Sequence, residues 1–158
     1  MKISIAEIKK SGKPVEIEYE EPARTFLPEI ELSSSLKVKC SLSFDNNSVS
    51  INGKIEALVS LVCTRCLEPY VFNIVRNFKI RYCNLKPRGD MIELESGDMD
   101  EEQIPEDGII DLNEIAREQT LLGIPLKQIC KENCLGLCPH CGVNLNLEKC
   151  KCPQQEGI

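Results

Sequence analysis

Residues 49–63 read VSINGKIEALVSLVC, and this stretch decides the fold. Every odd position carries an apolar or small side chain, from Val49 to Cys63, whereas most even positions are polar. Alternation with a period of two places one kind of side chain on each face of a strand. The stretch therefore predicts a long β-strand with one buried face.

The segments on either side of this strand alternate in the same way. In 36–44 the even positions are apolar, and in 70–82 they are apolar except for Arg76. A shorter alternation over 15–19 predicts an edge strand. The sequence Asp-Asn-Asn at 45–47 is a turn signal, and strands joined by short connections pair antiparallel. The sequence therefore predicts an antiparallel β-meander.

A helix is predicted after the strands. Asp111 has Glu114 at the capping-box distance, and Gly123 ends the helical pattern. Apolar side chains between them recur at helical spacing and predict a face packed on the sheet: Leu112, Ile115, Ala116 and Leu122. Ser4 followed by Glu7 predicts a second, brief helix near the N-terminus. The predicted fold class is α+β, a meander with one packed helix and a zinc-binding C-terminal tail.

The stretch 87–107 is strongly acidic. It has nine acidic residues and one basic residue, and its net charge of −8 leaves +2 for the rest of the chain. Because it has few apolar anchors, it predicts a mobile, solvated loop, with a partner-binding segment as the alternative. The chain is thus divided into a β-rich core, an acidic loop, a packed helix and a cysteine-rich tail, at 1–86, 87–108, 109–129 and 130–158.

Composition and charge limit what the 158-residue chain can do. With 42% apolar residues it can bury a core, and a formal charge of −6 argues against a general nucleic-acid binder. No apolar stretch approaches the length of about 20 residues that spans a bilayer. The N-terminal MKISIAEIKK has no continuous apolar signal-peptide region. We therefore expect a cytoplasmic protein without membrane contact.

Ten cysteines need an explanation in a cytoplasmic protein, where clustered thiols are more often metal ligands than disulfides. Eight of them form four close pairs. Zinc takes four thiolates in a tetrahedron, so four pairs predict two structural sites of four thiolates each. Gly142, directly after one pair, fits a zinc knuckle, in which backbone N–H groups turn toward sulfur. The candidate ligands are Cys63, Cys66, Cys130, Cys134, Cys138, Cys141, Cys150 and Cys152.

Two ways of dividing the four pairs between two sites remain open. In one, the third and fourth pairs along the chain close a knuckle within the tail, and the first pair takes the second as its distant partner. In the other, the second pair joins the third, and the first joins the fourth. The former closes the shorter loop for the tail and costs less chain entropy. It would fasten the tail to the predicted hairpin tip at Cys63 and Cys66.

Other residues near the pairs have simpler interpretations. Cys40 lies on the apolar face of a predicted strand and is expected to be a small core residue. Cys83 ends a strand and has no predicted role. His140 lies inside CPHC and is expected to be a spacer. Basic residues beside the ligands are expected to neutralise thiolate charge, with phosphate binding as the alternative: Arg65, Lys127, Lys131, Lys149 and Lys151.

The pattern predicts no active site. The spacing of Cys134, Cys138 and Cys141 also occurs in iron–sulfur enzymes, but their large βα barrel is not predicted here, so zinc is favoured. The CTRC motif at 63–66 is similar to a thiol redox motif, yet it follows an alternating strand rather than a βαβ pattern. Thiol redox or metal handling is the alternative function. No phosphate-binding Gly-rich loop or nucleophile elbow is present, so we expect neither catalysis nor a small-molecule substrate.

Three stretches together resemble one family. LVCTRCLEPY at 61–70, IPLKQICKENCLGLCPHCGVNLN at 124–146 and CKC at 150–152 are similar to the bacterial and plastid large ribosomal RNA subunit accumulation proteins, the YceD-like family. The resemblance implies a cytoplasmic protein, without enzymatic activity, that is needed for accumulation of large-subunit ribosomal RNA. It also implies that Cys63 and Cys66 belong to the shared domain, because some members lack the tail knuckle.

The predicted function is therefore ribosome biogenesis by a non-catalytic zinc protein. The expected partner is precursor large-subunit ribosomal RNA or a basic ribosomal protein. The acidic loop favours the protein, because opposite charges steer two molecules toward encounter.

Overall fold

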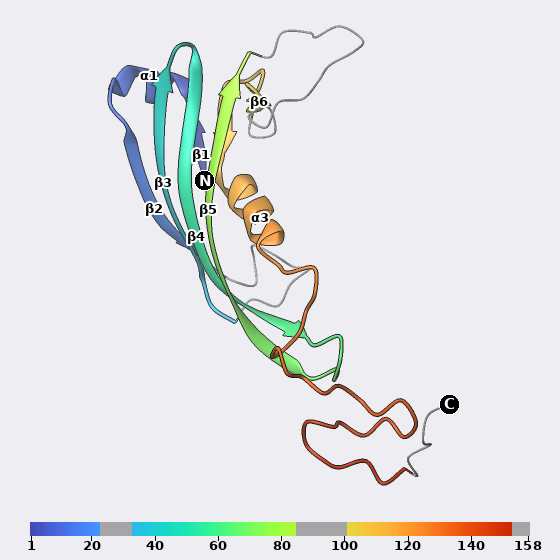
Figure 1. Cartoon of the computed structure of the whole chain (residues 1–158). Helices are drawn as coiled ribbons and strands as arrows, with labels where there is room; N and C mark the ends of the chain where they lie inside the picture. The colour runs from blue at the N-terminus through green and yellow to red at the C-terminus, as the bar shows by residue number, and fades with distance from the viewer. Residues whose placement is uncertain (23–32, 85–100, 153–158) are drawn as a thin grey trace, which may run out of the picture.

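The computed structural model describes residues 1–22, 33–84 and 101–152. Residues 87–100 of the predicted acidic loop and residues 153–158 of the predicted tail lie outside this described part. The chain forms a long curved sheet, a small second sheet and two helices, and the tail extends beyond one end of the long sheet (Figure 1). The architecture is mostly β, as the alternation predicts.

The main sheet has five strands, whose spatial order follows the order of the chain. They are β2 (Val15–Glu21), β3 (Leu36–Asp45), β4 (Ser48–Val62), β5 (Pro69–Cys83) and β6 (Glu101–Gln103). The first four pair antiparallel and confirm the predicted meander. β6 lies parallel to β5, so the whole sheet is mixed.

The short strand β6 falls inside the segment predicted as an acidic loop. Glu101 is in register with Arg81, and their side chains form an ion pair with an N–O distance of 3.9 Å. Pairing along the open edge of β5 satisfies backbone groups of this acidic stretch. Over 101–103 a strand therefore replaces the predicted loop.

β3 and β4 are joined at the predicted turn, where Asn46 and Asn47 have φ angles of 47° and 61°. Two consecutive residues with positive φ are typical of the two-residue turns whose twist suits a hairpin. The turn sets a register in which Phe44 faces Val49. In this register the apolar positions of both strands fall on one face of the sheet.

A small two-stranded sheet, β1 (Lys2–Ser4) and β7 (Ile109–Asp111), brings the N-terminus beside the later part of the chain. α1 (Ile5–Ser11) follows β1 and has the predicted capping box, in which the side chains of Ser4 and Glu7 each accept from a backbone N–H. No helix in the described ranges is long and apolar enough to cross a bilayer.

The second helix, α3 (Leu112–Leu122), covers one face of the main sheet (Figure 1). It begins at Asp111, whose carboxylate accepts from the N–H of Asn113 at 3.0 Å. Arg76 breaks the alternation of β5 because its Nε donates to Gln119 Oε1 on this helix at 2.9 Å. The residues of α3 that are buried are Leu112, Ile115, Ala116, Gln119 and Thr120. Leu122, which the helical spacing placed on the packed face, is 62% exposed instead, because the packed side of the chain continues from Thr120 to Gly123, which lies against Ile74 of β5.

The odd positions of β4 form the centre of the core, as predicted. Ile51, Ile55 and Val59 are fully buried. Gly53 fits the same face because the ring of Phe78, opposite it on β5, occupies the space that a Cβ atom would need. The alternation therefore corresponds to one face of the sheet, on which Phe78 packs against both of two buried clusters.

The β4–β5 hairpin projects beyond the rest of the sheet. Strand pairing with β3 ends at Glu56, whereas β4 and β5 stay paired until Val62 faces Pro69. The connection at 63–68 is the tip of this hairpin, and the tail passes beside it at the end of the molecule away from α1 (Figure 1). The fold thus holds the tip out as a docking point for the tail.

Candidate metal centres

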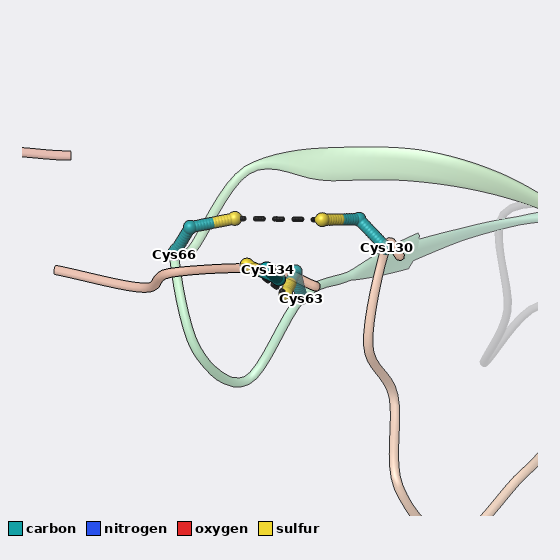
Figure 2. Close-up of side chains that lie close together, drawn as sticks. All are labelled: Cys63, Cys66, Cys130 and Cys134. Atoms are coloured by element: carbon teal, nitrogen blue, oxygen red, sulfur yellow. Dashed lines mark hydrogen bonds between the residues drawn. The ribbon is translucent and has the colours of Figure 1, made fainter. Parts of the chain in front are cut away.

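The first cluster of thiols joins the hairpin tip to the tail. Cys63 and Cys66 come from the tip and Cys130 and Cys134 from the segment after α3, and their four Sγ atoms all lie within 4.8 Å of one another. The Sγ–Sγ distance is 3.9 Å between Cys63 and Cys134 and 3.8 Å between Cys66 and Cys130. Figure 2 shows that both close pairs cross from tip to tail. We call this cluster the tip site.

The tip is a tight turn that gathers its two thiols. The N–H of Cys63 donates to the carbonyl of Glu68, and the N–H of Leu67 donates to the carbonyl of Cys63, both at 2.9 Å. Leu67 has a φ of 60°, in the left-handed region that glycine adopts most readily. The turn folds Cys66 back toward Cys63, so both sulfurs reach the same cluster.

Hydrogen bonds made by backbone and side-chain groups of the tip dock the tail on it. The N–H and Oγ1 of Thr64 both donate to the carbonyl of Gln128, at 2.8 and 3.1 Å. Leu137 N–H donates to the carbonyl of Arg65 at 3.0 Å, and Arg65 Nη1 donates to the carbonyl of Cys134 at 3.1 Å. Arg65, which is basic and next to a predicted ligand, thus holds the tail backbone.

Gly136 permits this close approach. It has a φ of 75°, and a Cβ atom at this position would lie 3.0 Å from the carbonyl oxygen of Arg65. Both the conformation and the space therefore favour glycine at this contact between tail and tip.

The second cluster closes within the tail, and we call it the tail site. The Sγ atoms of Cys138, Cys141, Cys150 and Cys152 lie within 4.8 Å of one another. The Sγ of Cys150 is 3.3 Å from that of Cys138 and 3.7 Å from that of Cys141. Gly142 has a φ of 74°, and its N–H donates to the carbonyl of Cys138 at 2.9 Å. This is the knuckle turn expected after the CPHC pair.

The two clusters differ in burial. At the tip site Cys63 is 0% exposed and Cys134 is 4% exposed. At the tail site Cys138 is 6% exposed, whereas Cys141 lies on the surface. The tip site is therefore shielded from solvent by the hairpin and the tail together, and the tail site is open on one side.

Backbone N–H groups favour the thiolate form in both clusters. Burial raises the pKa of the Cys63 thiol, but backbone N–H groups directed at its sulfur outweigh this and lower the pKa to about 6. At the tail site, the N–H groups of Cys141 and His140 lower the pKa of Cys138 to about 6. Because the thiolate is the form that binds metal, each cluster contains a ligand prepared for it.

The donor set fits zinc. All ten cysteines are free thiols. A tetrahedron with Zn–S bonds of about 2.3 Å separates its sulfurs by about 3.8 Å, and the closest Sγ–Sγ distances in the clusters are 3.3 to 3.9 Å. Tyr70 packs against the tip site, and its buried hydroxyl has no hydrogen-bond partner in the described part of the chain. That O–H group is available to donate to a thiolate.

The structure brings the eight predicted ligands together in two groups of four, divided as in the first of the two divisions considered from the sequence. Cys40 is 4% exposed and is confirmed as a core residue, and burial raises its pKa to about 11. Cys83 Sγ lies 3.8 Å from Glu101 Oε2 on β6. His140 is exposed, and its backbone N–H is directed at Cys138 of the tail site.

Sequence reasoning missed Asn146. Its Nδ2 donates to Cys134 Sγ at 3.4 Å, although it lies between two cysteines of the tail site. The one sequence feature that could have pointed to it is the pair of asparagines in VNLN, before the last cysteine pair. These asparagines have no role predicted from the sequence. The contact becomes visible only once the tail has folded back on the tip site.

A family model and a plant relative both place the chain among proteins of one family. The family described as "Large ribosomal RNA subunit accumulation protein YceD" matches residues 51–157, which include both clusters. The Arabidopsis thaliana protein "Large ribosomal RNA subunit accumulation protein YCED homolog 1, chloroplastic" is 30% identical over 129 residues, covering 67% of this chain and 40% of that protein. A Mycobacterium tuberculosis protein named as uncharacterized is 29% identical over 129 residues, covering 80% of this chain.

The chain spans 60% of the length of the Mycobacterium protein and 40% of that of the Arabidopsis protein. No solved structure matches the chain.

Proposed function

The chain belongs to the YceD family of large ribosomal RNA subunit accumulation proteins, and on this basis we propose that it supports accumulation of large-subunit ribosomal RNA during ribosome assembly. It acts in the cytoplasm as a non-catalytic binding protein. The observation that carries this proposal is the family match over 51–157, because it spans the hairpin, the helix and the tail.

In this proposal each cluster binds one zinc ion. The projecting hairpin has too little surface to bury a hydrophobic core of its own. The zinc at the tip site supplies the missing stabilisation by joining the hairpin to the tail. Four thiolates complete the tetrahedral coordination of zinc and leave no open position for water or substrate. Both ions are therefore structural, which agrees with a non-catalytic role.

The proposed partner is a basic ribosomal protein. A hollow of about 420 Å³ lies between β6, β7 and α3 and is lined by Lys2 and by several carboxylates. These carboxylates are Glu102, Asp107, Asp111, Glu114 and Glu118. Burial raises the pKa of Glu118, and the charges of Glu102 and Glu114 raise it further. Such a concentration of negative charge attracts basic proteins and repels RNA phosphates.

Metal binding would make the tip and tail less suited to RNA as well. Residues 63–68 and 127–152 contain five basic and three acidic side chains, a formal charge of +2. Each four-thiolate site around a divalent ion has a formal charge of −2, which changes the total for these segments to −2. Exposed leucines offer apolar contact for a protein instead: Leu67, Leu126, Leu135 and Leu147.

The metal content of the chain tests the first half of the proposal. Protein purified without added metal is analysed by elemental mass spectrometry, and two zinc ions per chain are expected. Detection of iron together with inorganic sulfide would instead indicate that the cysteines hold an iron–sulfur cluster, and would contradict the zinc assignment. Folded, metal-free protein with a disulfide between Cys63 and Cys66 would support thiol redox chemistry instead and refute the zinc assignment.

Association with ribosomal precursors tests the second half. A tagged chain in its native host is expected to co-sediment with precursors of the large subunit at moderate salt, and its depletion should lower large-subunit ribosomal RNA. Crosslinking should then recover a basic ribosomal protein. Crosslinks to RNA alone would refute the proposed partner, and absence from all precursor particles would refute the proposed role.

A further inference from the structure

The segment between Cys141 and Cys150 turns back and touches the tip site. Asn146 Nδ2 donates to Cys134 Sγ at 3.4 Å, and Leu145 N–H donates to the carbonyl of Gly136 at 2.9 Å. A residue enclosed by ligands of the tail site therefore makes a contact to a ligand of the tip site.

The orientation of the Asn146 amide is fixed by its partners. The N–H of Leu135 donates to Oδ1 of Asn146 at 2.9 Å, and a backbone N–H can only donate, so this atom is the oxygen. The amide nitrogen consequently faces Cys134. The side chain of Asn144 accepts from both the N–H and the Nδ2 of Asn146, at 3.0 and 2.9 Å, and holds the amide in place.

We propose that Asn146 is a positioning residue through which metal binding at the tail site strengthens metal binding at the tip site. Closing the tail site fixes the ends of the loop that carries Asn146, and the fixed loop presents its N–H group to Cys134. The inference rests on the proposed binding of metal by both clusters and adds that the two sites are coupled.

The environment of Cys134 makes this hydrogen bond effective. Cys134 is 4% exposed, so water does not solvate its sulfur. An N–H group directed at a buried thiolate stabilises the charged ligand and fixes its direction toward the metal.

The coupling must act in both directions. If an occupied tail site raises the affinity of the tip site, an occupied tip site raises the affinity of the tail site by the same factor. The Asn144 Nδ2 group, 3.4 Å from Glu68 Oε1, ties the same loop to the hairpin, so both clusters and the hairpin meet in this one loop.

Cadmium NMR on the full chain tests the proposal, because each four-thiolate site gives its own resonance and competition with a chelator gives its affinity. Asn146→Asp keeps the oxygen that accepts from Leu135 but replaces the donor. We expect it to shift the tip-site resonance and to lower tip-site affinity by about 10- to 100-fold, as the loss of a ligand's hydrogen-bond partner usually does. Leu147→Ala, which changes an exposed side chain in the same loop as Asn146, should change neither quantity.

Removal of the tail site separates coupling from local damage. Cys150→Ser should lower tip-site affinity by the same factor as Asn146→Asp, and the double variant should show no further loss. Additive losses, or an unchanged tip site in both Asn146→Asp and Asn146→Ala, would overturn the coupling while leaving the zinc proposal intact. A wild-type chain that binds no cadmium or zinc would overturn both.

Discussion

The tip site and the tail site each consist of four cysteine thiols, but they hold different parts of the chain together. The tip site joins a hairpin to a segment about 64 to 71 residues further along, whereas the closest contacts of the tail site span 9 and 12 residues. The first is buried between two elements, and the second is open at Cys141. One site therefore fastens the tail to the sheet, and the other shapes the tail itself.

The two knuckles also solve the same backbone problem with different residues. Each has a residue with positive φ directly after its second cysteine, Gly142 at 74° in the tail and Leu67 at 60° at the tip. Glycine adopts this conformation without steric strain, whereas a leucine there is strained by about 1–2 kcal/mol. The hairpin and the docked tail hold Leu67 in place, which a local loop alone would not do.

Removal of metal should give the largest effect and separate the two sites most clearly. We expect a chelator to extract the tail-site ion first, because Cys141 is exposed, and the tip-site ion later. The second step should release the tail, since apparent zinc binding contributes about 10–16 kcal/mol in finger-like peptides. A zinc indicator dye measures the release of each ion. Amide exchange at Thr64, whose N–H donates to the carbonyl of Gln128, reports release of the tail. Release of both ions in a single phase would contradict the claim that the tip site is better shielded than the tail site.

Removing one ligand from each site should give the next largest difference. Cys63→Ser should lose one metal ion, detach the tail and destabilise the hairpin by about 3 kcal/mol or more. Cys150→Ser should also lose one ion but should lower hairpin stability by only about 1.5–3 kcal/mol, the contribution transmitted through Asn146. Metal content and thermal unfolding measure both variants. Equal destabilisation by the two would mean that the sites do not have separate roles.

Two glycines with the same φ sharpen the comparison at a smaller scale. Gly142→Ala should cost about 1–2 kcal/mol for its backbone conformation alone, because nothing lies within 4 Å of the added Cβ. Gly136→Ala should cost more, because its Cβ also crowds the Arg65 carbonyl at 3.0 Å. Amide exchange at Leu137 reports this contact. Faster exchange is expected in Gly136→Ala than in Gly142→Ala, and the reverse order would place the main tail contact elsewhere.

The smallest expected effect is an increase in the stability of the folded protein. Leu67→Gly should stabilise the metal-loaded protein by about 0.5–1 kcal/mol, because relief of the left-handed strain exceeds the greater freedom of glycine in the unfolded chain. Leu67 is 63% exposed, so little packing is lost. Chemical denaturation with metal present measures the change, with Leu67→Ala as the control that keeps a Cβ atom. Destabilisation by glycine would show that the leucine side chain makes a needed contact.

The fold was predictable where one period continued over many residues. The strands β3, β4 and β5 follow the alternation closely, since a buried face imposes apolar side chains at every second position. Arg76 breaks the pattern because its partner, Gln119, lies on a helix far away in the chain. The strand β6 could not be read from its acidic sequence, since it is defined by pairing with β5 and not by a buried face of its own.

The sequence alone determined which thiols are available and how closely they are spaced within each pair, because neighbouring residues are held together by the chain itself. It also determined that the tail turns sharply at Gly142, since the required conformation depends on one residue. The tertiary structure decided which pairs meet, that the hairpin tip is the docking point, and that Asn146 reaches Cys134. Those contacts depend on the relative placement of segments far apart in the chain, and only the packing of α3 and the tail against the projecting hairpin fixes that placement.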